Sequence, residues 1–160
     1  MRYSVNQASV TELYEQLTSC TYIPPLESRV SLKQYSEKIH CNAVRFEYWD
    51  HDNILSGLCA MYTNYNNEPF GYITNVGIRD LLQGKGIATQ LLAKALKYAK
   101  DKGLYFVDLE VFHTNTRAIA LYKKFGFYDY KQNDDRIFMR LDILKYKPET
   151  GLSMKHNNNE

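Results

Sequence analysis

Residues 83–89, with the sequence QGKGIAT, form the part of the chain whose composition most favours binding of a phosphate group. Gly84 and Gly86 allow a ligand to approach the backbone closely, and the apolar repeat from Ile87 onwards is typical of a helix. The first N–H groups of a helix have no partner inside it, and together with the helix dipole they attract anions. The alternative is an ordinary strand-to-helix turn. Neither the P-loop pattern nor the dinucleotide-binding pattern is matched well.

A second set of candidate residues lies in the segment 105–112, where acidic and apolar residues alternate as in a strand. Leu109 points to one face with the other apolar residues, whereas Asp108 and Glu110 point to the opposite face. Burial in the middle of a sheet raises the pKa of a carboxylic acid, which suits a general base that takes a proton from an amine. Glu110 is therefore a candidate general base. The alternative is a structural carboxylate held by hydrogen bonds.

Two amphipathic helices must position these residues. In the segment 87–102 apolar residues recur every three or four positions, which predicts a helix that ends at Gly103. The segment 116–125 has the same periodicity and is followed by Gly126, a typical helix terminator. Asn115 stands just before this second helix, where asparagine is among the best N-cap residues.

The remaining elements are shorter. Ser9 and Ser31 each begin a capping-box pattern, which predicts a helix of about ten residues after the first and one to about His40 after the second. Pro24 and Pro25 separate these two helices. One predicted strand, 71–78, has a slip in its apolar pattern that indicates a bulge. The predicted strands are 43–49, 54–62, 71–78, 105–112, 127–132 and 137–141.

Composition limits the class of protein. With 160 residues and 44% hydrophobic residues, the chain predicts one α/β domain over residues 1–144 and a polar tail over 145–160. Its net charge of +2 is too small to favour nucleic acid as a partner. No apolar run reaches the about 18 to 20 residues of a membrane span, and the first residues do not resemble an export signal. We therefore expect a soluble, cytoplasmic protein without a membrane partner.

Metal and disulfide chemistry are not indicated by the cysteines and histidines. The three cysteines lie far apart and include no Cys-x-x-Cys pair. The four histidines are scattered without the spacing of metal ligands, so we expect no metal. These residues are Cys20, Cys41, Cys59, His40, His51, His113 and His156.

From Val76 to Phe127 the chain resembles the GNAT superfamily of acetyl-CoA-dependent N-acetyltransferases. Gln83-x-x-Gly86-x-Ala88 stands where this family has Arg/Gln-x-x-Gly-x-Gly/Ala, after a strand that ends in Val76-Gly77-Ile78. The two blocks occur in the family's order, joined by an amphipathic helix, and the matching motifs cover about a third of the chain. The second block consists of Leu109-Glu110-Val111, Asn115, Ala118, Leu121-Tyr122 and Gly126-Phe127.

This resemblance implies a GNAT fold, with a mixed, mostly antiparallel sheet of about six to seven strands and helices on both faces. It also implies acetyl-CoA as co-substrate. Backbone groups of Val76 and Ile78 would pair with the pantetheine arm and polarise the thioester carbonyl, while the amides of 84–89 would hold the pyrophosphate. Asn115 would contact the cofactor, cap its helix, or do both. The implied cofactor-binding residues are Val76, Gly77, Ile78, Gln83, Gly84, Lys85, Gly86, Ile87, Ala88, Thr89, Asn115 and Tyr122.

The implied reaction is direct attack of a free amine on the thioester, with no covalent enzyme intermediate. In the family the tyrosine that matches Tyr122 lies near the cofactor sulfur and can protonate the departing thiolate; the alternative is a tyrosine of the core. Some members use a glutamate at the position of Glu110 as the base, alone or through water. Cys41 and Cys59 have no histidine at a telling spacing, so neither is favoured as a nucleophile.

The acceptor is less constrained. In this fold the amine would enter beside residues 22–29, the loop 63–70 and the turn near Asp134. Arg29 is a candidate for binding a phosphate or carboxylate of the acceptor, whereas a solvated arginine is the alternative. Aromatic residues that could stack on the acceptor are Tyr22, Tyr65 and Phe70.

We expect a small-molecule amine as acceptor, because the chain is compact and its charge is modest. The alternatives are a protein N-terminus or lysine, a non-catalytic acyl-CoA sensor, or a nucleotide-binding protein that uses the Gly84–Gly86 turn. The resemblance is also compatible with a homodimer, since such domains often pair.

Overall fold

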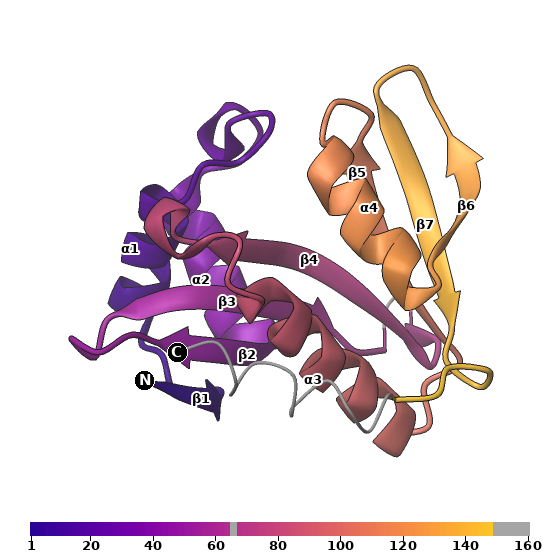
Figure 1. Ribbon diagram of the computed structural model, residues 1–160, viewed down its shortest axis with the longest axis horizontal. Helices are drawn as coiled ribbons and strands as arrows, with labels where there is room; N and C mark the ends of the chain where they lie inside the picture. Colours follow the sequence, from indigo (N-terminus) through magenta and orange to yellow (C-terminus); the bar gives the residue numbers. More distant parts are fainter. Residues whose placement is uncertain (65–66, 149–160) are drawn as a thin grey trace.

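Seven strands form one sheet in the computed structural model, which describes residues 1–64 and 67–148 (Figure 1). They are β1 (Arg2–Val5), β2 (Val44–Trp49), β3 (Leu55–Tyr62), β4 (Phe70–Ile78), β5 (Phe106–Phe112), β6 (Tyr128–Gln132) and β7 (Arg136–Asp142). Across the sheet the order is β1-β2-β3-β4-β5-β7-β6. Every neighbouring pair is antiparallel except β4 and β5, whose parallel pairing requires a crossover connection. The helix α3 (Ile87–Asp101) lies in that crossover.

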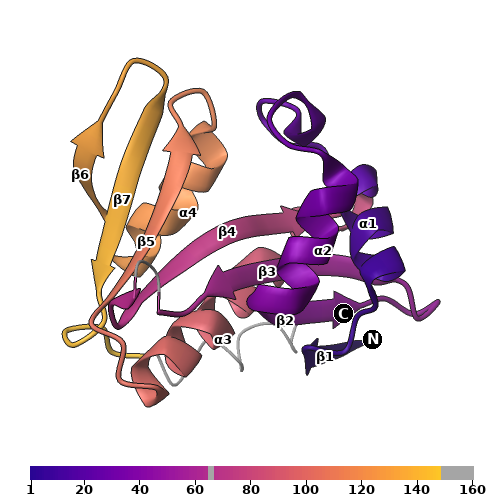
Figure 2. The ribbon, with the colours of Figure 1, turned by 180° about the vertical axis from the view of Figure 1, so that it is seen from behind.

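Helices cover both faces of the sheet (Figures 1 and 2). On one face lie α3 and α4 (Thr116–Phe125), and on the other lie α1 (Val10–Ser19) and α2 (Leu32–Asn42). Ser9 caps α1 through a complete capping box, and the Ser31 hydroxyl accepts a hydrogen bond from the Gln34 N–H at the start of α2. Two short 3-10 helices are η1 (Leu26–Ser28) and η3 (Asp80–Leu82).

Apolar side chains fill the space between the helices and each face of the sheet. On the α3 side, Leu91 and Leu96 are fully buried against the strands. On the opposite side, Leu13 and Leu17 of α1 and Ile39 of α2 are buried. The amphipathic pattern of each helix therefore meets one apolar face of the sheet, and the sheet lies between two cores.

The sheet opens between its two parallel strands. β4 pairs with β5 only from Phe70 to Ile73, which face Phe106 to Leu109. Beyond these pairs the two strands diverge, so the C-terminal half of β4 has no neighbour on that side (Figures 1 and 2). The divergence begins at a bulge in β4. Ala60 and Met61 of β3 face Asn75 and Ile73, so Thr74 of β4 has no partner residue on β3. The bulge that the apolar slip predicted is confirmed.

Most of the predicted elements are confirmed within one or two residues, including the α/β class and the mixed sheet. The strand β1 was not predicted, because its four residues include no fully buried side chain and so show no apolar pattern. Pairing with β2 alone makes it a strand.

The end of the predicted domain is less simple. Tyr146 lies within the predicted polar tail, yet it packs against the core on the α3 side. The remainder of that tail, residues 149–160, lies outside the described residues. Among the described residues no helix is long and apolar enough to cross a membrane.

Candidate functional site

A cleft of about 630 Å³ lies where β4 and β5 diverge. It is bounded by the end of β4, the start of α3, the start of α4 and the loop that follows α1. Every predicted cofactor-binding residue except Lys85 lines this cleft. The lining residues are Thr21, Tyr22, Ile23, Val76, Gly77, Ile78, Asp80, Leu82, Gln83, Gly84, Gly86, Ile87, Ala88, Thr89, Asn115, Arg117, Ala118, Leu121 and Tyr122.

The turn before α3 has the backbone conformation of an anion-binding site. Gly84 and Gly86 have φ angles of +79° and +81°, in the left-handed region that favours glycine. Gly86 is the N-cap of α3, and no side chain caps the first N–H groups of that helix. These N–H groups and the positive end of the helix dipole border the cleft. The turn can therefore hold a phosphate group.

The free edge of β4 offers backbone hydrogen bonds to an extended ligand. The Arg79 N–H donates to the Ser56 carbonyl across the β3–β4 ladder, at 2.9 Å. In an antiparallel ladder the backbone groups of successive residues point to alternate sides, so Gly77 also faces β3. Val76 and Ile78 then face away from β3, toward the cleft, where β5 is no longer paired.

Arg117 is a positively charged residue of the cleft that was not predicted from the sequence. Arg117, in the first turn of α4, donates from Nη1 to Gln83 Oε1 at 3.1 Å, and its guanidinium lies near Gly84. Gln83 in turn donates to the Ile78 carbonyl at 3.3 Å. Arg117 thus reaches the glycine turn from α4, 34 residues beyond its partner Gln83, so no local pattern encodes this contact. It stands two positions after Asn115, and that spacing is the only signal that the sequence offers.

Tyr122 lies at the junction of the cleft and a second, smaller hollow. The side chain is 8% exposed, and burial raises the pKa of its hydroxyl, with a smaller contribution from Cys59. Among the described residues the hydroxyl has no hydrogen-bond partner, and it is not among the fully buried unpaired atoms. Tyr122 also belongs to the buried core on the α3 side, where its ring centre lies 5.8 Å from that of Phe127. The raised pKa keeps the hydroxyl protonated near neutral pH, so it can donate a hydrogen bond to a ligand.

Asn115 lines both spaces and caps α4. Its Oδ1 accepts a hydrogen bond from the Ala118 N–H at 3.3 Å. The predicted N-cap role is confirmed. Because Asn115 also lines both spaces, the capping role and a ligand-binding role are compatible.

The smaller hollow, of about 80 Å³, opens on the β5 side of Tyr122. Residues from four separated segments line it: the loop and 3-10 turn after α1, the bulge of β4, the end of β5, and the start and middle of α4. They are Tyr22, Ile23, Leu26, Arg29, Ile73, Thr74, Asn75, Val76, Leu109, Glu110, Val111, Phe112, Asn115 and Tyr122. Of the predicted acceptor residues, Tyr22 and Arg29 lie here.

Two other predicted acceptor positions do not reach this hollow. Phe70 packs edge-to-face on Phe106, with ring centres 5.2 Å apart, and the prediction that it stacks on the acceptor finds no support. Asp134 does not line the hollow either, although Arg136 at the start of β7 pairs with Glu110, which does. Tyr65 lies outside the described residues.

The expected burial of Glu110 is wrong. Its side chain is 31% exposed and pairs with Arg136, whose Nη1 donates to Glu110 Oε2 at 2.9 Å. The face of β5 that carries Glu110 has no helix over it, because α4 covers the opposite face (Figure 2). The buried carboxylate of this strand is Asp108, which Arg140 binds through two hydrogen bonds of 2.7 and 2.9 Å. Glu110 instead lines the hollow as an accessible carboxylate.

Buried polar side chains hold the bulged end of β4 in place. The Tyr22 hydroxyl donates to Asn75 Oδ1 at 3.2 Å and lies so close to Gly77 that any side chain there would overlap it. Gln16, which is fully buried, donates to the Gly77 carbonyl at 3.0 Å. The Tyr35 hydroxyl contacts the Thr74 carbonyl at 2.7 Å. Gln16 and Tyr35 were missed by the sequence analysis because their partners lie about 40 to 60 residues away.

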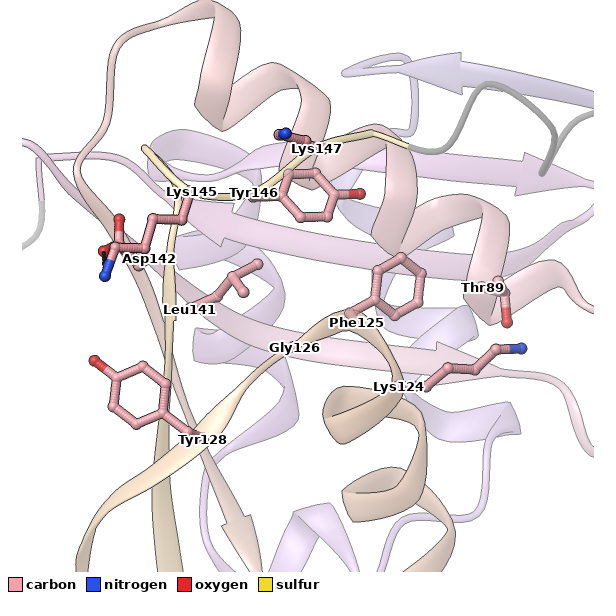
Figure 3. A pocket seen from close by; sticks show the side chains of 10 residues that line it. All are labelled: Thr89, Lys124, Phe125, Gly126, Tyr128, Leu141, Asp142, Lys145, Tyr146 and Lys147. Carbon is pink, nitrogen blue, oxygen red and sulfur yellow. Dashed lines mark ion pairs between the residues drawn. The ribbon is translucent and has the colours of Figure 1, made fainter.

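A third space, a cavity of about 590 Å³, lies between α4 and the end of β7 (Figure 3). In Figure 3 Lys124 and Thr89 lie at one end of it, while Asp142 and Lys145 lie at the other. Asp142 and Lys145 form an ion pair at 3.8 Å. Thr89 is the only predicted site residue in its lining, and neither Glu110 nor Tyr122 contributes to it. The predicted site residues therefore gather at the cleft and the smaller hollow rather than at this cavity.

Cysteine chemistry is not favoured at the site. Cys59 is fully buried, and burial raises the pKa of its thiol to about 12. A thiolate is the reactive form of cysteine, so Cys59 does not supply a nucleophile near neutral pH. Within residues 1–64 and 67–148, no group of three or more histidine, cysteine, aspartate or glutamate residues has an arrangement that could hold a metal ion.

Comparison with known families agrees with this geometry. A family model described as the acetyltransferase (GNAT) family matches residues 10–127. An uncharacterized N-acetyltransferase of Methanocaldococcus jannaschii is 35% identical over 69 residues, which are 43% of this chain and 30% of that protein. A mycothiol acetyltransferase of an Arthrobacter species is 39% identical over 57 residues, 36% of this chain and 18% of that protein. The matched segments thus span less than a third of these two relatives.

Solved structures share the fold over nearly the whole chain. The ribosomal-protein-S18-alanine N-acetyltransferase of Escherichia coli has a TM-score of 0.72, at 17% identity, covering 89% of this chain and 94% of that one. A spermidine N-acetyltransferase chimera of Vibrio cholerae and human sequences has a TM-score of 0.70, at 22% identity, with coverage of 91% and 98%. An N-acetyltransferase of Thermoplasma acidophilum, solved in complex with coenzyme A, has a TM-score of 0.67, at 15% identity, with coverage of 89% and 99%.

Proposed function

Because the chain belongs to the GNAT family of acetyltransferases and is therefore an acyltransferase, we propose that it transfers the acetyl group of acetyl-CoA to the primary amine of a small molecule. One observation carries this proposal: the cleft between the diverging strands meets the smaller hollow at Tyr122, which lines both. The turn at Gly84 and Gly86, which can hold a phosphate group, lines the cleft, and Glu110 lines the hollow. The coenzyme A complex of the Thermoplasma neighbour supports the choice of co-substrate.

The residues of the cleft suit the successive parts of acetyl-CoA. The N–H groups at the start of α3 and the guanidinium of Arg117 would hold the phosphates. The backbone groups of Val76 and the N–H of Ile78 would pair with the amide-bearing pantetheine arm as a neighbouring strand does, while the Ile78 carbonyl is held by Gln83. Acetyl-CoA supplies an activated acetyl group, bound to sulfur as a thioester. Its acetyl end would then lie beside Tyr122.

The proposed reaction needs only groups that border the two spaces. The free amine attacks the thioester carbonyl, a C–N bond forms, and the C–S bond breaks. A backbone N–H of the β4 edge donates to the carbonyl oxygen as negative charge develops on it. Glu110, directly or through water, takes the proton that the amine loses. Tyr122, whose raised pKa keeps it protonated, gives its proton to the departing sulfur.

A small-molecule acceptor is supported by relatives. Relatives that match this chain include a mycothiol acetyltransferase, and structural neighbours include a spermidine N-acetyltransferase. Acetylation of a protein N-terminus or lysine is the alternative acceptor class, and the S18-alanine neighbour is an example of it.

The proposal can be tested by following thiol release from acetyl-CoA with a colorimetric reagent. The amine would be drawn from separate pools of amino acids, amino sugars, amino alcohols, polyamines and short peptides. Thermal unfolding with and without coenzyme A would be measured in parallel. Stabilisation by coenzyme A together with thiol release from a small-molecule pool supports the proposal. Release from the peptide pool alone would favour a protein acceptor, and stabilisation without release would favour a sensor.

A further inference from the structure

We propose that the acceptor amine carries a negatively charged group, a carboxylate or a phosphate, and that Arg29 binds this group. This inference rests on the proposed acetyl transfer and names the chemical class of its acceptor. It assigns the two ends of the acceptor to two sides of the small hollow. The amine would face Glu110 and Tyr122, and the anionic group would face the guanidinium of Arg29.

Arg29 lines the smaller hollow, and its charge has no carboxylate partner among the described residues. Arg2, Arg79 and Arg117 also lack an ion pair within that part of the chain, but none of them lines this hollow. Arg45, Arg136 and Arg140 each pair with a carboxylate, at 3.3, 2.9 and 2.7 Å. Arg29 forms no ion pair with any carboxylate of residues 1–64 and 67–148. Its guanidinium lies over the ring of Phe112, 5.0 Å from the ring centre. The planar N–H fork is therefore available to a ligand of the hollow.

The segment that carries Arg29 is anchored. Leu26 is only 4% exposed and belongs to the core under α1 and α2. The Arg29 N–H donates to the Leu26 carbonyl at 3.0 Å, and the Ser28 hydroxyl donates to the Pro25 carbonyl at 2.6 Å. Stacking on Phe112 restrains the far end of the side chain. A preorganised arginine loses less entropy on binding an anion than a freely rotating one.

The charges around the hollow favour an anion over a cation. The guanidinium of Arg136 also contacts the Phe112 ring, at 4.8 Å, but Glu110 neutralises it through the 2.9 Å ion pair. Arg29 therefore leaves the hollow with one uncompensated positive charge. Its charge also reaches Tyr35, where it slightly offsets the burial that raises the pKa of this hydroxyl to about 12. An acceptor with a second positive charge would meet repulsion here.

The position of the charges within one hollow indicates a short acceptor. Arg29, Phe112 and Glu110 all line the same hollow, so one small ligand can reach both charged side chains. An amine and an anionic group that lie a few bonds apart in one molecule suit this arrangement. Amino acids and phosphorylated amino alcohols have this arrangement, whereas a long polyamine does not.

The experiment compares anionic acceptors with matched acceptors that lack the charge. Thiol release from acetyl-CoA is measured with alanine against alaninamide, phosphoethanolamine against ethanolamine, and spermidine alone. These pairs distinguish a carboxylate from a phosphate. Since the amine of alaninamide is less basic than that of alanine, a preference for alanine cannot come from a larger fraction of free amine. We expect at least one anionic member to have a KM lower by about 10- to 100-fold than its neutral partner, the range of one charged hydrogen-bonded pair.

Variants of the whole chain then assign the preference to Arg29. In Arg29→Gln the KM of the anionic acceptor should rise by about 10- to 100-fold, while its kcat, the KM of the neutral partner and the KM of acetyl-CoA stay within about twofold. Arg29→Lys should lie between the two, because it keeps the charge but loses the fork. The matched control is Arg2→Gln, which removes another arginine stacked on an aromatic ring, at Trp49 on the far edge of the sheet.

The outcomes separate this inference from the proposed function. Equal or better use of the neutral members or of spermidine, or an Arg29→Gln variant with an unchanged KM ratio, would overturn the assignment of Arg29 while leaving acetyl transfer in place. Absence of thiol release with every amine, despite stabilisation by coenzyme A, would overturn acetyl transfer itself. Arg29→Gln must also keep the unfolding midpoint of the parent chain, which shows that the KM change does not come from misfolding.

Discussion

The proposed site has two ends, a phosphate end in the cleft and an acceptor end in the smaller hollow, and they are built in different ways. The phosphate end consists mostly of backbone, from one continuous stretch that includes Gly84, Gly86 and the first turn of α3. The acceptor end consists of side chains from four separated segments, among them Arg29, Glu110 and Tyr122. A ligand common to all family members can be held by backbone groups, which every sequence has. A ligand that differs among relatives, such as mycothiol and spermidine, must be recognised by side chains that can be exchanged.

The difference predicts that the two ends can be disabled separately. A change to the backbone turn should abolish binding of acetyl-CoA and, with it, all turnover. A change to one side chain of the acceptor end should leave acetyl-CoA bound and alter kcat or the KM of the amine. Tyr122 lines both spaces, so its replacement shows whether this residue contributes to binding of acetyl-CoA or to turnover.

The largest effect is expected for Gly86→Val. The new side chain would sit at a φ of +81° and cover the N–H groups at the start of α3, so affinity for coenzyme A should fall by more than about 100-fold. Isothermal titration with coenzyme A measures this loss. Gly103→Val is the matched control, because Gly103 has a φ of +74° but lies at the opposite end of α3 with open space around it. Similar loss in both variants would mean that misfolding, not the phosphate turn, is responsible.

A smaller effect, confined to turnover, is expected for Glu110→Gln. If Glu110 takes the proton of the amine, kcat at neutral pH should fall by about 100-fold, with the affinity for acetyl-CoA changed less than about threefold. Steady-state kinetics with the best amine of the pools gives both values. Asp135→Asn serves as control, since it removes the other carboxylate near Arg136, at 3.9 Å, without touching the hollow. A kcat unchanged across pH would remove Glu110 from the mechanism.

For Tyr122→Phe we expect kcat to fall by about ten- to a hundredfold, because a thiolate leaves readily and needs less help than an alkoxide. The loss should appear in kcat, with coenzyme A binding preserved. Tyr98→Phe, on the sheet-facing side of α3 against Phe46, removes a hydroxyl away from the cleft and should change neither value by more than about twofold. Weaker coenzyme A binding in Tyr122→Phe would assign Tyr122 to the phosphate end instead.

The smallest effect concerns stability at high pH. Burial raises the pKa of Tyr122 above its ordinary value of 10.0, so the folded chain holds this proton more tightly than the unfolded chain. The resulting stability is complete below pH 10 and is lost as the pH rises above it. At pH 11 the ionisation of unfolded Tyr122 should cost about 1.4 kcal/mol of unfolding free energy. Urea denaturation at pH 8 and pH 11 should therefore show the stability of the parent chain falling more than that of Tyr122→Phe. Equal falls would contradict burial of an ionisable hydroxyl here.

The phosphate end could be predicted from the sequence because the patterns that indicate it involve residues close together along the chain. The apolar periodicity of α3, the glycines before it and the capping of α4 by Asn115 each depend on residues within one or two turns. The family motif strengthened this prediction, since its residues occupy the same continuous stretch. Lys85 was the exception, because it does not line the cleft.

The acceptor end could be predicted only as a group of segments. Alternation along β5 correctly placed Asp108 and Glu110 on one face, but it could not tell which of them is buried. Arg140 covers Asp108, whereas no helix covers Glu110, and both facts depend on strands and helices distant in sequence. The tie between Tyr22 and Asn75 likewise joins residues 53 positions apart.

The sequence by itself determined the helices, the succession of the main strands along the chain, the glycine turn and the family to which the chain belongs. Each of these follows from side-chain periodicity or from backbone conformations that only certain residues adopt. The tertiary structure decided the divergence of β4 from β5, the exposure of Glu110, the unpaired charge of Arg29 and the reach of Arg117 to the glycine turn. These properties depend on which surfaces the folded chain brings together, because burial and pairing of charge are set by neighbours in space rather than along the chain.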